Sequence, residues 1–153
     1  MTPSVTIRPA VPAERSALEA LQRRASLVWE EYREALLAHP DAIELPDVQI
    51  RDGHVVVAVL TDRIAGFAVV LPREDGDAEL DGLFVEPDLW RGGIGRRLIR
   101  EAERLALRGN AKNLCVIGNP RAEKFYLACG FVTTGMHETR FGPGLVMRKT
   151  LGN

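Results

Sequence analysis

A glycine-rich stretch in the middle of the chain has residues suited to binding an anion. The predicted strand Leu80–Val85 leads into Glu86–Gly95, which contains three glycines, and a helical pattern follows. Where a strand turns into a helix, the first backbone N–H groups of the helix have no partner and lie at its positive end. Glycines let a phosphate approach this backbone closely. The sequence therefore predicts a phosphate or pyrophosphate site, although a tight turn without a ligand has a similar pattern.

Two common nucleotide-binding motifs do not match this stretch. A dinucleotide-binding fold needs Gly-x-Gly-x-x-Gly, but Leu98 stands where the third glycine would follow Gly93 and Gly95. The sequence Gly-x-x-x-x-Gly-Lys-Ser/Thr of a P-loop is absent. An 18-residue window from Arg91 onward holds six arginines and only two acids. Arginine side chains match the geometry of phosphate, so this cluster could contribute to an anion site. The other interpretation is that the arginines form the solvated face of a helix.

Hydrophobic periodicity predicts a mixture of strands and helices. We expect strands at Val5–Arg8, Val55–Leu60, Ile64–Leu71, Ala78–Val85, Leu114–Ile117, Val132–Thr134 and Leu145–Met147. We expect helices from Pro12 to Val28, at Glu30–Ala38, from Gly92–Gly95 to Gly109, and from Pro120 to Gly130. We expect a loop at Asp41–Asp52 and a strand buried on both faces at Leu114–Ile117. The segment Gly142–Gly144 should separate the last two strands. This order predicts an α/β (α+β) fold in a single domain, residues 1–153, with a mixed, mostly antiparallel sheet and helices on its faces.

Composition excludes several classes of protein. The 153 residues carry a formal net charge of −1, whereas a general nucleic-acid binder needs a basic excess. No apolar run approaches the roughly 18 residues of a membrane span, and the first residues do not form a signal peptide. Two cysteines and three isolated histidines offer neither a disulfide framework nor metal-ligand spacing. We therefore expect a cytoplasmic protein with no metal, no membrane association and no nucleic-acid partner.

Two blocks of sequence carry a family resemblance. The first runs from Glu79 through the loop to Leu98, and the second is Asn119-x-x-Ala-x-x-Phe-Tyr-x-x-x-Gly-Phe131. Together they resemble the GCN5-related N-acetyltransferase (GNAT) superfamily in its small single-domain bacterial form, over nearly the whole chain. In the loop signature of that family, Gln/Arg-x-x-Gly-x-Gly/Ala, Trp90 takes the place of Gln or Arg. The resemblance implies the GNAT acyl-CoA N-acyltransferase fold, a mixed, mostly antiparallel twisted sheet flanked by helices.

The resemblance implies acetyl-CoA as co-substrate and an amine as acceptor. The loop N–H groups would hold the pyrophosphate, and the pantetheine arm would pair with strand Leu83–Val85 like an added strand. The same strand would supply an N–H to the thioester carbonyl. By resemblance the cofactor-binding residues are Leu83, Phe84, Val85, Arg91, Gly92, Gly93, Ile94, Gly95, Arg96, Asn119 and Tyr126.

Two carboxylates are candidates for the base that deprotonates the acceptor ammonium. Glu79 lies 11 residues before Trp90, where histone-type members of the superfamily have a catalytic Glu. Asp81 follows two residues later and so shares its face of the strand. Either could instead bind water or a nearby arginine, and many members of the family use no fixed base.

Tyr126 is the candidate acid that protonates the leaving thiolate, since it lies four residues before Gly130, at the position of the family's general-acid Tyr. The other interpretation is a tyrosine that packs between helix and sheet. Asn119 precedes Pro120 and suits a helix N-cap. The resemblance adds a contact between Asn119 and the CoA amides.

Three residues are weaker candidates for contacts with the acceptor. Trp29 and Tyr32 lie where the first two helices meet, a junction that roofs the acceptor site in this family, and they could equally fill the core. His137 precedes Glu138 near the C-terminal hairpin, where a solvated turn is the other interpretation.

The sequence thus predicts an N-acetyltransferase with direct transfer in a ternary complex. The acceptor would be a small-molecule or peptide amine, and family habit suggests a homodimer. Two alternatives stay open at this point: a non-catalytic acetyl-CoA-binding sensor or regulatory module, and an acyltransferase that uses another acyl-CoA. No motif identifies the acceptor, because the fold and cofactor site do not dictate acceptor chemistry.

Overall fold

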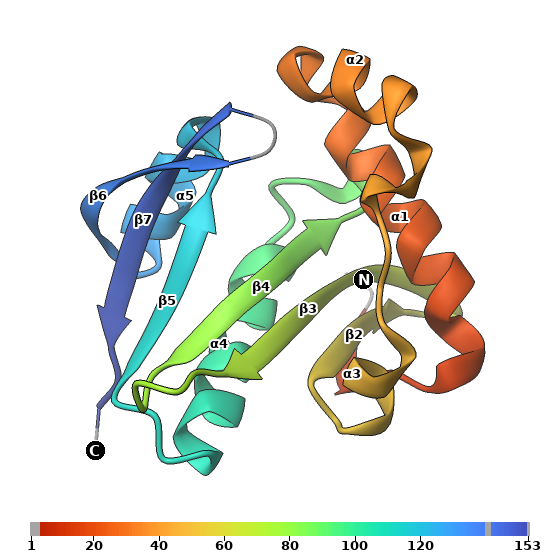
Figure 1. Ribbon diagram of the computed structural model, residues 1–153. Helices are drawn as coiled ribbons and strands as arrows, with labels where there is room; N and C mark the ends of the chain where they lie inside the picture. The colour runs from red at the N-terminus through yellow and green to blue at the C-terminus, as the bar shows by residue number, and fades with distance from the viewer. Residues whose placement is uncertain (1–3, 140–141, 153) are drawn as a thin grey trace. The chain divides into compact units, whose positions relative to one another are not determined.

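The computed structural model describes residues 4–139 and 142–152, without the side chains of residues 31 and 40. Its strands form one sheet in the order β1-β2-β3-β4-β5-β7-β6. The strands are β1 (Val5–Pro9), β2 (Val55–Leu60), β3 (Arg63–Pro72), β4 (Ala78–Val85), β5 (Asn113–Gly118), β6 (Val132–Thr139) and β7 (Gly142–Thr150) (Figure 1). The helices are α1 (Arg15–Leu27), α2 (Glu30–Ala38), α3 (Asp47–Arg51), α4 (Ile94–Arg108) and α5 (Glu123–Ala128). Short 3-10 turns are η1 (Pro12–Glu14), η2 (Pro40–Ala42), η3 (Pro87–Leu89) and η4 (Pro120–Ala122).

The strand pairing is mixed, as predicted. β2 is antiparallel to both β1 and β3, and β7 is antiparallel to both β5 and β6. β4 and β5 are parallel, with Ala78 opposite Leu114 and Glu79 opposite Cys115. The chain forms two compact units, Met1–Val69 with Gly82–Leu98, and Val70–Asp81 with Ile99–Asn153.

In the first unit, β2 and β3 form the centre of the core. Val55–Ala58 are all buried, as expected for a strand covered on both faces. The helix α1 contributes Leu18, Leu21 and Ala25, whose spacing of three and four residues places them on one face. Gly66 lies so close to Phe84 that a Cβ atom there would come within 2.7 Å of the Phe84 carbonyl oxygen.

In the second unit, β5, β7 and β6 lie side by side (Figure 1). One face of this part of the sheet is buried through Leu114, Val116 and Met147. Lys149 of β7 forms an ion pair with Glu103 of α4 at 3.0 Å, which ties the helix to the strand on that same face. The residues that alternate with the buried ones, such as Ile117, therefore point to the opposite face.

Some local predictions were wrong or only partly right. The segment Asp41–Asp52 is not only a loop, because α3 forms within it, buries Ile50 and pairs Asp47 with Arg51 at 2.9 Å. The five residues of α3 are too few to show a helical periodicity of apolar side chains in the sequence. The strand β5 is buried on both faces only as far as Val116, because Ile117 is 43% exposed.

The last two strands are also longer than predicted, and Gly142–Gly144 belong to β7 rather than separating the strands. Every residue of β6 is exposed, so its sequence lacks the alternation that marks a half-buried strand. Pro143 is tolerated within β7 because pairing with β5 begins only at Leu145, beyond the proline.

Candidate active site

The glycine-rich loop of the first unit follows β4 directly. After Val85 the chain makes the η3 turn and then enters α4 at Ile94. Arg91 and Gly93 have φ angles of 70° and 86°. Residues in this left-handed region, alternating with ordinary ones, turn successive N–H groups toward one side and form a concavity for an anion.

The backbone N–H groups of Arg91–Arg96 have no acceptor among the described residues. The N–H of Trp90 bonds to the Pro87 carbonyl, and the next N–H with a partner is that of Arg97, which bonds to Gly93 at 3.2 Å. Three of the six N–H groups belong to the first turn of α4, where a helix supplies no partner. The predicted run of available donors is therefore present in the folded chain.

Two ion pairs hold the loop on the first unit. Glu86, which is 7% exposed, accepts two hydrogen bonds from Arg24 of α1, at 3.0 and 2.7 Å. Asp88 accepts two from Arg63 of β3, at 3.1 and 2.8 Å. These hydrogen bonds raise the pKa of the Arg24 guanidinium and lower the pKa of the Asp88 carboxyl. Bidentate pairs of this kind fix orientation as well as position.

Trp90 has contacts that the sequence did not predict. Its indole Nε1 donates a hydrogen bond to the Val85 carbonyl at 2.8 Å. Its ring stacks on Trp29, with centroids 5.5 Å apart and planes at 23°. Trp29, predicted as an acceptor contact, thus packs against the loop at the N-cap of α2, and half-buried Tyr32 donates its backbone N–H to the Trp29 carbonyl.

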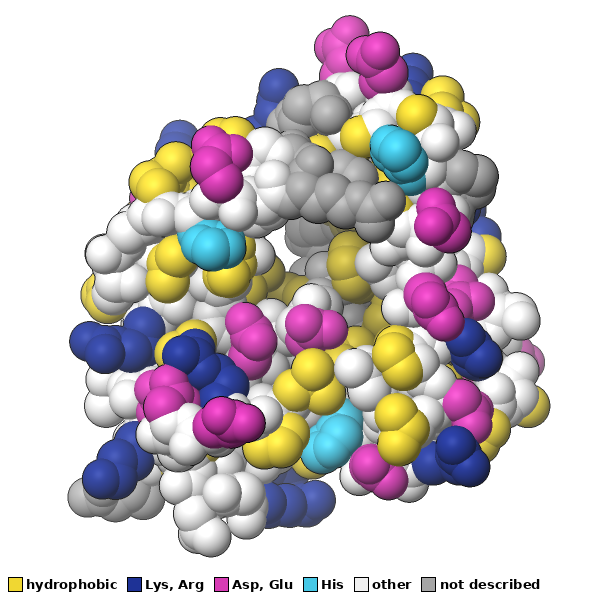
Figure 2. Space-filling model, viewed as in Figure 1, with side chains coloured by type: hydrophobic (Ala, Val, Ile, Leu, Met, Phe, Trp, Pro, Cys, Tyr) yellow, Lys and Arg dark blue, Asp and Glu magenta, His cyan; other side chains and the backbone are white. Residues whose placement is uncertain are grey.

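The arginine cluster is mostly a solvated helix face. Arg97 donates to the Val5 carbonyl, and Arg104 pairs with Glu101 at 3.3 Å. Arg91 and Arg96 flank the loop and are exposed. On the face shown in Figure 2, acidic and basic side chains are interspersed.

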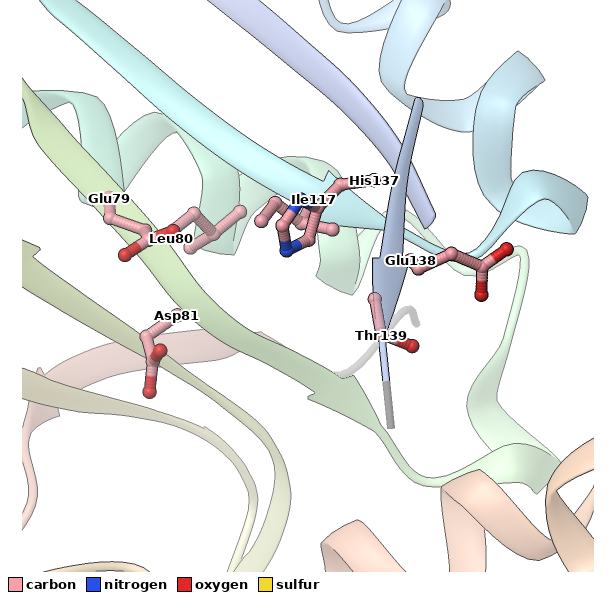
Figure 3. Close-up of a pocket in the computed structure, with 7 residues that line it drawn as sticks. All are labelled: Glu79, Leu80, Asp81, Ile117, His137, Glu138 and Thr139. Carbon is pink, nitrogen blue, oxygen red and sulfur yellow. The ribbon is translucent and has the colours of Figure 1, made fainter. Parts of the chain in front are cut away.

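A pocket of about 430 Å³ opens on the second unit, lined by Glu79, Leu80, Asp81, Ile117, His137, Glu138 and Thr139. Figure 3 shows these side chains on β4, β5 and β6. The predicted base candidates and the predicted acceptor contact His137 therefore meet at one site, although they are far apart in the sequence. The pairing between β4 and β5 ends at Glu79 and Cys115, so Asp81 and Ile117 lie where the two strands no longer pair.

The shape of this pocket depends on Gly144. A Cβ atom at this position would come within 2.6 Å of Ile117 Cγ2 and 3.0 Å of Thr139 Cγ2. Gly144 pairs with His137 across the hairpin. The glycine therefore lets the β6–β7 hairpin approach β5, which places His137 and Thr139 at the pocket wall.

The two carboxylates differ in their surroundings. Partial loss of water raises the pKa of Asp81. Glu79 lies near enough to Arg73 for their charges to interact, and Arg73 also pairs with Asp75 at 2.7 Å. A raised pKa suits a general base, because efficient proton transfer needs a pKa near the working pH. Both carboxylates share one face of β4.

Cys115 lies opposite Glu79 in the strand pairing but is a poor nucleophile. It is buried, and burial raises the pKa of its thiol. The thiolate is the reactive form of cysteine. Burial therefore keeps Cys115 in its less reactive thiol form.

Tyr126 is buried in the second unit at the short helix α5. Its ring lies against Gly118, where a Cβ atom would come within 3.1 Å of Tyr126 Cε2. Phe125 and Phe131 make edge-to-face contacts with it, with centroids 5.2 and 5.5 Å apart. Burial raises the pKa of the phenol above its ordinary value of 10, so the hydroxyl keeps its proton at neutral pH.

Asn119 caps the turn that leads to α5, as predicted, because its Oδ1 accepts a hydrogen bond from the Arg121 N–H at 2.9 Å. Its Nδ2 is buried and has no acceptor in the described part of the chain. A buried donor without a partner is costly, so an acceptor from a bound ligand would stabilise it. This side chain can donate a hydrogen bond to a carbonyl oxygen of a ligand.

A family model described as the acetyltransferase (GNAT) family matches residues 21–131. This is well over half of the chain. The chain belongs to the GNAT family of acetyltransferases. Both motif blocks of the sequence lie within the matched region, whereas His137 lies beyond its end.

Solved structures agree with this assignment. A protein described as a streptothricin acetyltransferase from Bacillus anthracis, in complex with acetyl coenzyme A, is 25% identical with a TM-score of 0.59. That match covers 64% of this chain and 62% of the other, so the chain spans less than two thirds of that protein. A GCN5-related N-acetyltransferase from Rhodopseudomonas palustris is 24% identical over 99% and 97% of the two chains, with a TM-score of 0.75. The PaiA N-acetyltransferase from Thermoplasma acidophilum, in complex with coenzyme A, is 20% identical over 96% and 99%, with a TM-score of 0.76. The last two matches show the GNAT fold.

Within this GNAT chain, the predicted site residues fall into the two units. The loop Arg91–Arg96, the strand Leu83–Val85 and the pair Trp29 and Tyr32 belong to the first. Glu79, Asp81, Asn119, Tyr126 and His137 belong to the second. Sequence reasoning missed Ile117, Thr139 and Gly144 at the pocket. The glycine was visible in the sequence, but no periodic signal showed that it belonged to a strand.

Residues 4–139 and 142–152 contain no group of three or more His, Cys, Asp or Glu side chains arranged to hold a metal ion. Of the helices in this part of the chain, none is both long and apolar enough to cross a membrane.

Proposed function

We propose that this GNAT chain transfers an acetyl group from acetyl-CoA to a primary amine, by direct transfer in a ternary complex. One observation carries the proposal: the six successive backbone N–H groups of Arg91–Arg96 without acceptors in the described chain. Donors arranged this way at the start of a helix suit a pyrophosphate. The exposed Arg91 and Arg96 add positive charge beside it.

Two further features fit the rest of acetyl-CoA. The buried Nδ2 of Asn119 offers a hydrogen bond to an amide carbonyl of the pantetheine arm. The strand Leu83–Val85 offers backbone groups for pairing, although the Val85 carbonyl already accepts from Trp90. Bound there, acetyl-CoA supplies an acetyl group activated as a thioester.

On the acceptor side, Glu79 or Asp81 removes a proton from the ammonium, directly or through a water molecule, and so frees the nitrogen lone pair. The carboxylates lie on the wall of one pocket, which favours entry of a cationic amine over an anion. His137 and Thr139 on the opposite wall position the acceptor. An N–H of the strand Leu83–Val85 stabilises the carbonyl oxygen, which gains negative charge as the C–N bond forms.

On the donor side, Tyr126 gives its proton to the departing sulfur as the C–S bond breaks. Its buried phenol keeps the proton across the neutral range, and the same burial makes the hydroxyl a weaker acid than a free tyrosine. The nitrogen loses two protons, one before it attacks and one as the amide forms. Both leave through the pocket carboxylate to water, and solvent returns a proton to the tyrosine. The overall reaction yields an amide and free CoA.

The test is turnover with a panel of amines: an aminoglycoside-like amine, a polyamine, an amino acid, an arylalkylamine and a peptide N-terminus. CoA thiol release and the acetylated product are measured together. We expect one amine class to give equal amounts of both, and Tyr126→Phe to lower the rate. Acetyl-CoA binding without thiol release over the panel would instead support the sensor alternative. Faster release from succinyl- or propionyl-CoA would identify another donor.

A further inference from the structure

Trp90 occupies the position where the GNAT loop signature has Gln or Arg, and its contacts suggest what the indole does there. Nε1 donates to the Val85 carbonyl at 2.8 Å. The ring stacks on Trp29 at 5.5 Å between centroids. Trp90 is still 36% exposed, so the ring is not simply part of the core.

The hydrogen bond closes the turn that leads into the loop. It joins the last residue of β4 to the residue just before Arg91, where the run of available N–H groups begins. Arg91 has a φ of 70°, a conformation that is unfavourable for a residue with a Cβ atom. Such a conformation persists only where surrounding contacts fix it. The adjacent Trp90 provides two such contacts.

The partner of the stack is itself held in place. Trp29 is the N-cap residue of α2, and its carbonyl accepts the Tyr32 N–H at 3.0 Å. The Trp29 N–H bonds to the Ser26 carbonyl at 3.2 Å, at the end of α1. The stack therefore fastens the loop to the junction between two helices of the same unit.

We propose that Trp90 is a positioning residue that, through Val85 and Trp29, holds the loop Arg91–Arg96 in the conformation that binds acetyl-CoA. The inference rests on the proposed function, because it concerns the same loop. At the position where the family signature has Gln or Arg, this chain thus has a tryptophan that supports the loop backbone. Trp90 acts through the loop backbone and takes no part in the chemistry.

The test compares Trp90→Phe, Trp29→Leu and a control, Leu37→Ala, by calorimetric titration of the whole chain with acetyl-CoA. Phenylalanine can still stack but cannot donate to Val85, whereas Trp29→Leu removes the stack and leaves that bond. We expect Trp90→Phe to raise the acetyl-CoA Kd about three- to ten-fold, the loss expected for one hydrogen bond. Trp29→Leu should also raise the acetyl-CoA Kd. Leu37 is 66% exposed on α2, so its replacement should leave the Kd unchanged.

A second readout separates positioning from general stability. At saturating acetyl-CoA, Trp90→Phe should retain the wild-type kcat while its KM for acetyl-CoA rises. Trp29 and Trp90 are the only tryptophans of the chain, so intrinsic fluorescence reports on the stack. Acetyl-CoA should change the emission with the same Kd as calorimetry, and less so in Trp29→Leu.

The outcomes are distinguishable. If wild-type protein binds acetyl-CoA and both tryptophan variants bind it equally well, this inference is overturned and the proposed function stands. If Trp90→Phe does not fold, the acetyl-CoA Kd of Trp29→Leu decides. A raised Kd supports the inference, and a wild-type Kd overturns it. If wild-type protein does not bind acetyl-CoA, the proposed function fails and the role of Trp90 in that binding fails with it.

Discussion

Glu79 of β4 and His137 of β6 line the same pocket of the second unit. β5 and β7 separate their strands in the sheet order, and the hairpin reaches the pocket because Gly144 has no side chain. A carboxylate and an imidazole on facing walls suit a site that admits an ammonium and removes its proton. Substitutions in this pocket and in the glycine-rich loop should therefore have separable effects on the acceptor and on acetyl-CoA.

Replacing the base should slow the reaction sharply at neutral pH. We expect either Glu79→Gln or Asp81→Asn to lower kcat about 10²-fold or more, the contribution of a general base, and the other variant to lower it only a few-fold. Steady-state rates between pH 5 and 9 check this. Glu74→Gln, in an exposed turn of the same unit, is the control. Wild-type pH profiles for both pocket variants would mean that neither carboxylate is the base.

Asp81→Asn should also affect stability in a pH-dependent way. Asp81 is exposed overall, but partial loss of water around its carboxyl raises its folded-state pKa. The folded protein therefore favours the protonated carboxyl, and ionisation opposes folding. Stability is therefore greatest below the unfolded pKa of about 4 and falls as the pH rises through the folded pKa. The amide variant lacks this penalty, so its Tm should exceed that of wild type at pH 7 and equal it below about pH 4. A lower Tm at pH 7 would contradict this.

Tyr126→Phe should lower kcat about 10²-fold and change the acetyl-CoA Kd less than about three-fold, since the phenyl ring retains its packing on Gly118. The raised pKa of Tyr126 has a second consequence. The wild-type rate should show no decline from this residue below about pH 10, and the stability that the buried phenol provides should be lost only above that pH. An unchanged kcat in the variant would assign Tyr126 to packing alone.

Gly93→Ala should weaken acetyl-CoA binding. Gly93 has a φ of 86°, where alanine costs about 1–2 kcal/mol, and a bound pyrophosphate would require that conformation. We expect a Kd about five- to thirty-fold higher by calorimetry. Gly76→Ala is the matched control, since Gly76 has a φ of 89° and, like Gly93, open space where the added methyl group would lie. Equal effects of the two variants on the Kd would show that general backbone strain is responsible.

Gly144→Ala should disturb the acceptor side alone. The added methyl group would overlap Ile117 and push the hairpin away from β5, at a cost of about 1–3 kcal/mol in stability. We expect a higher KM for the amine and an unchanged Kd for acetyl-CoA. Adding Ile117→Ala makes room for the methyl group and should restore part of the amine affinity. Loss of acetyl-CoA affinity in Gly144→Ala would contradict this division.

Much of the fold could be predicted from periodicity and breakers. The strand Ala78–Val85 and the helix Glu30–Ala38 form at their predicted bounds, since strong patterns end there at prolines or polar turns. The C-terminal hairpin could not be predicted fully, because all of β6 is exposed and its bulge between Thr133 and Gly135 changes which residues share a face. The Trp29–Trp90 stack depends on tertiary packing between segments far apart in the sequence, for which no local pattern exists.

Acetyl-CoA binding by the loop Arg91–Arg96 is tested most directly by thermal unfolding of the wild-type chain with acetyl-CoA, CoA and ATP at matched concentrations. A ligand that binds only the folded state adds about 2.7 kcal/mol of stability at one hundred times its Kd. We expect a higher Tm with both acetyl-CoA and CoA and no change with ATP. No shift with any of the three would mean that the loop is only a turn, and would contradict the proposal of an acetyl-CoA-dependent enzyme.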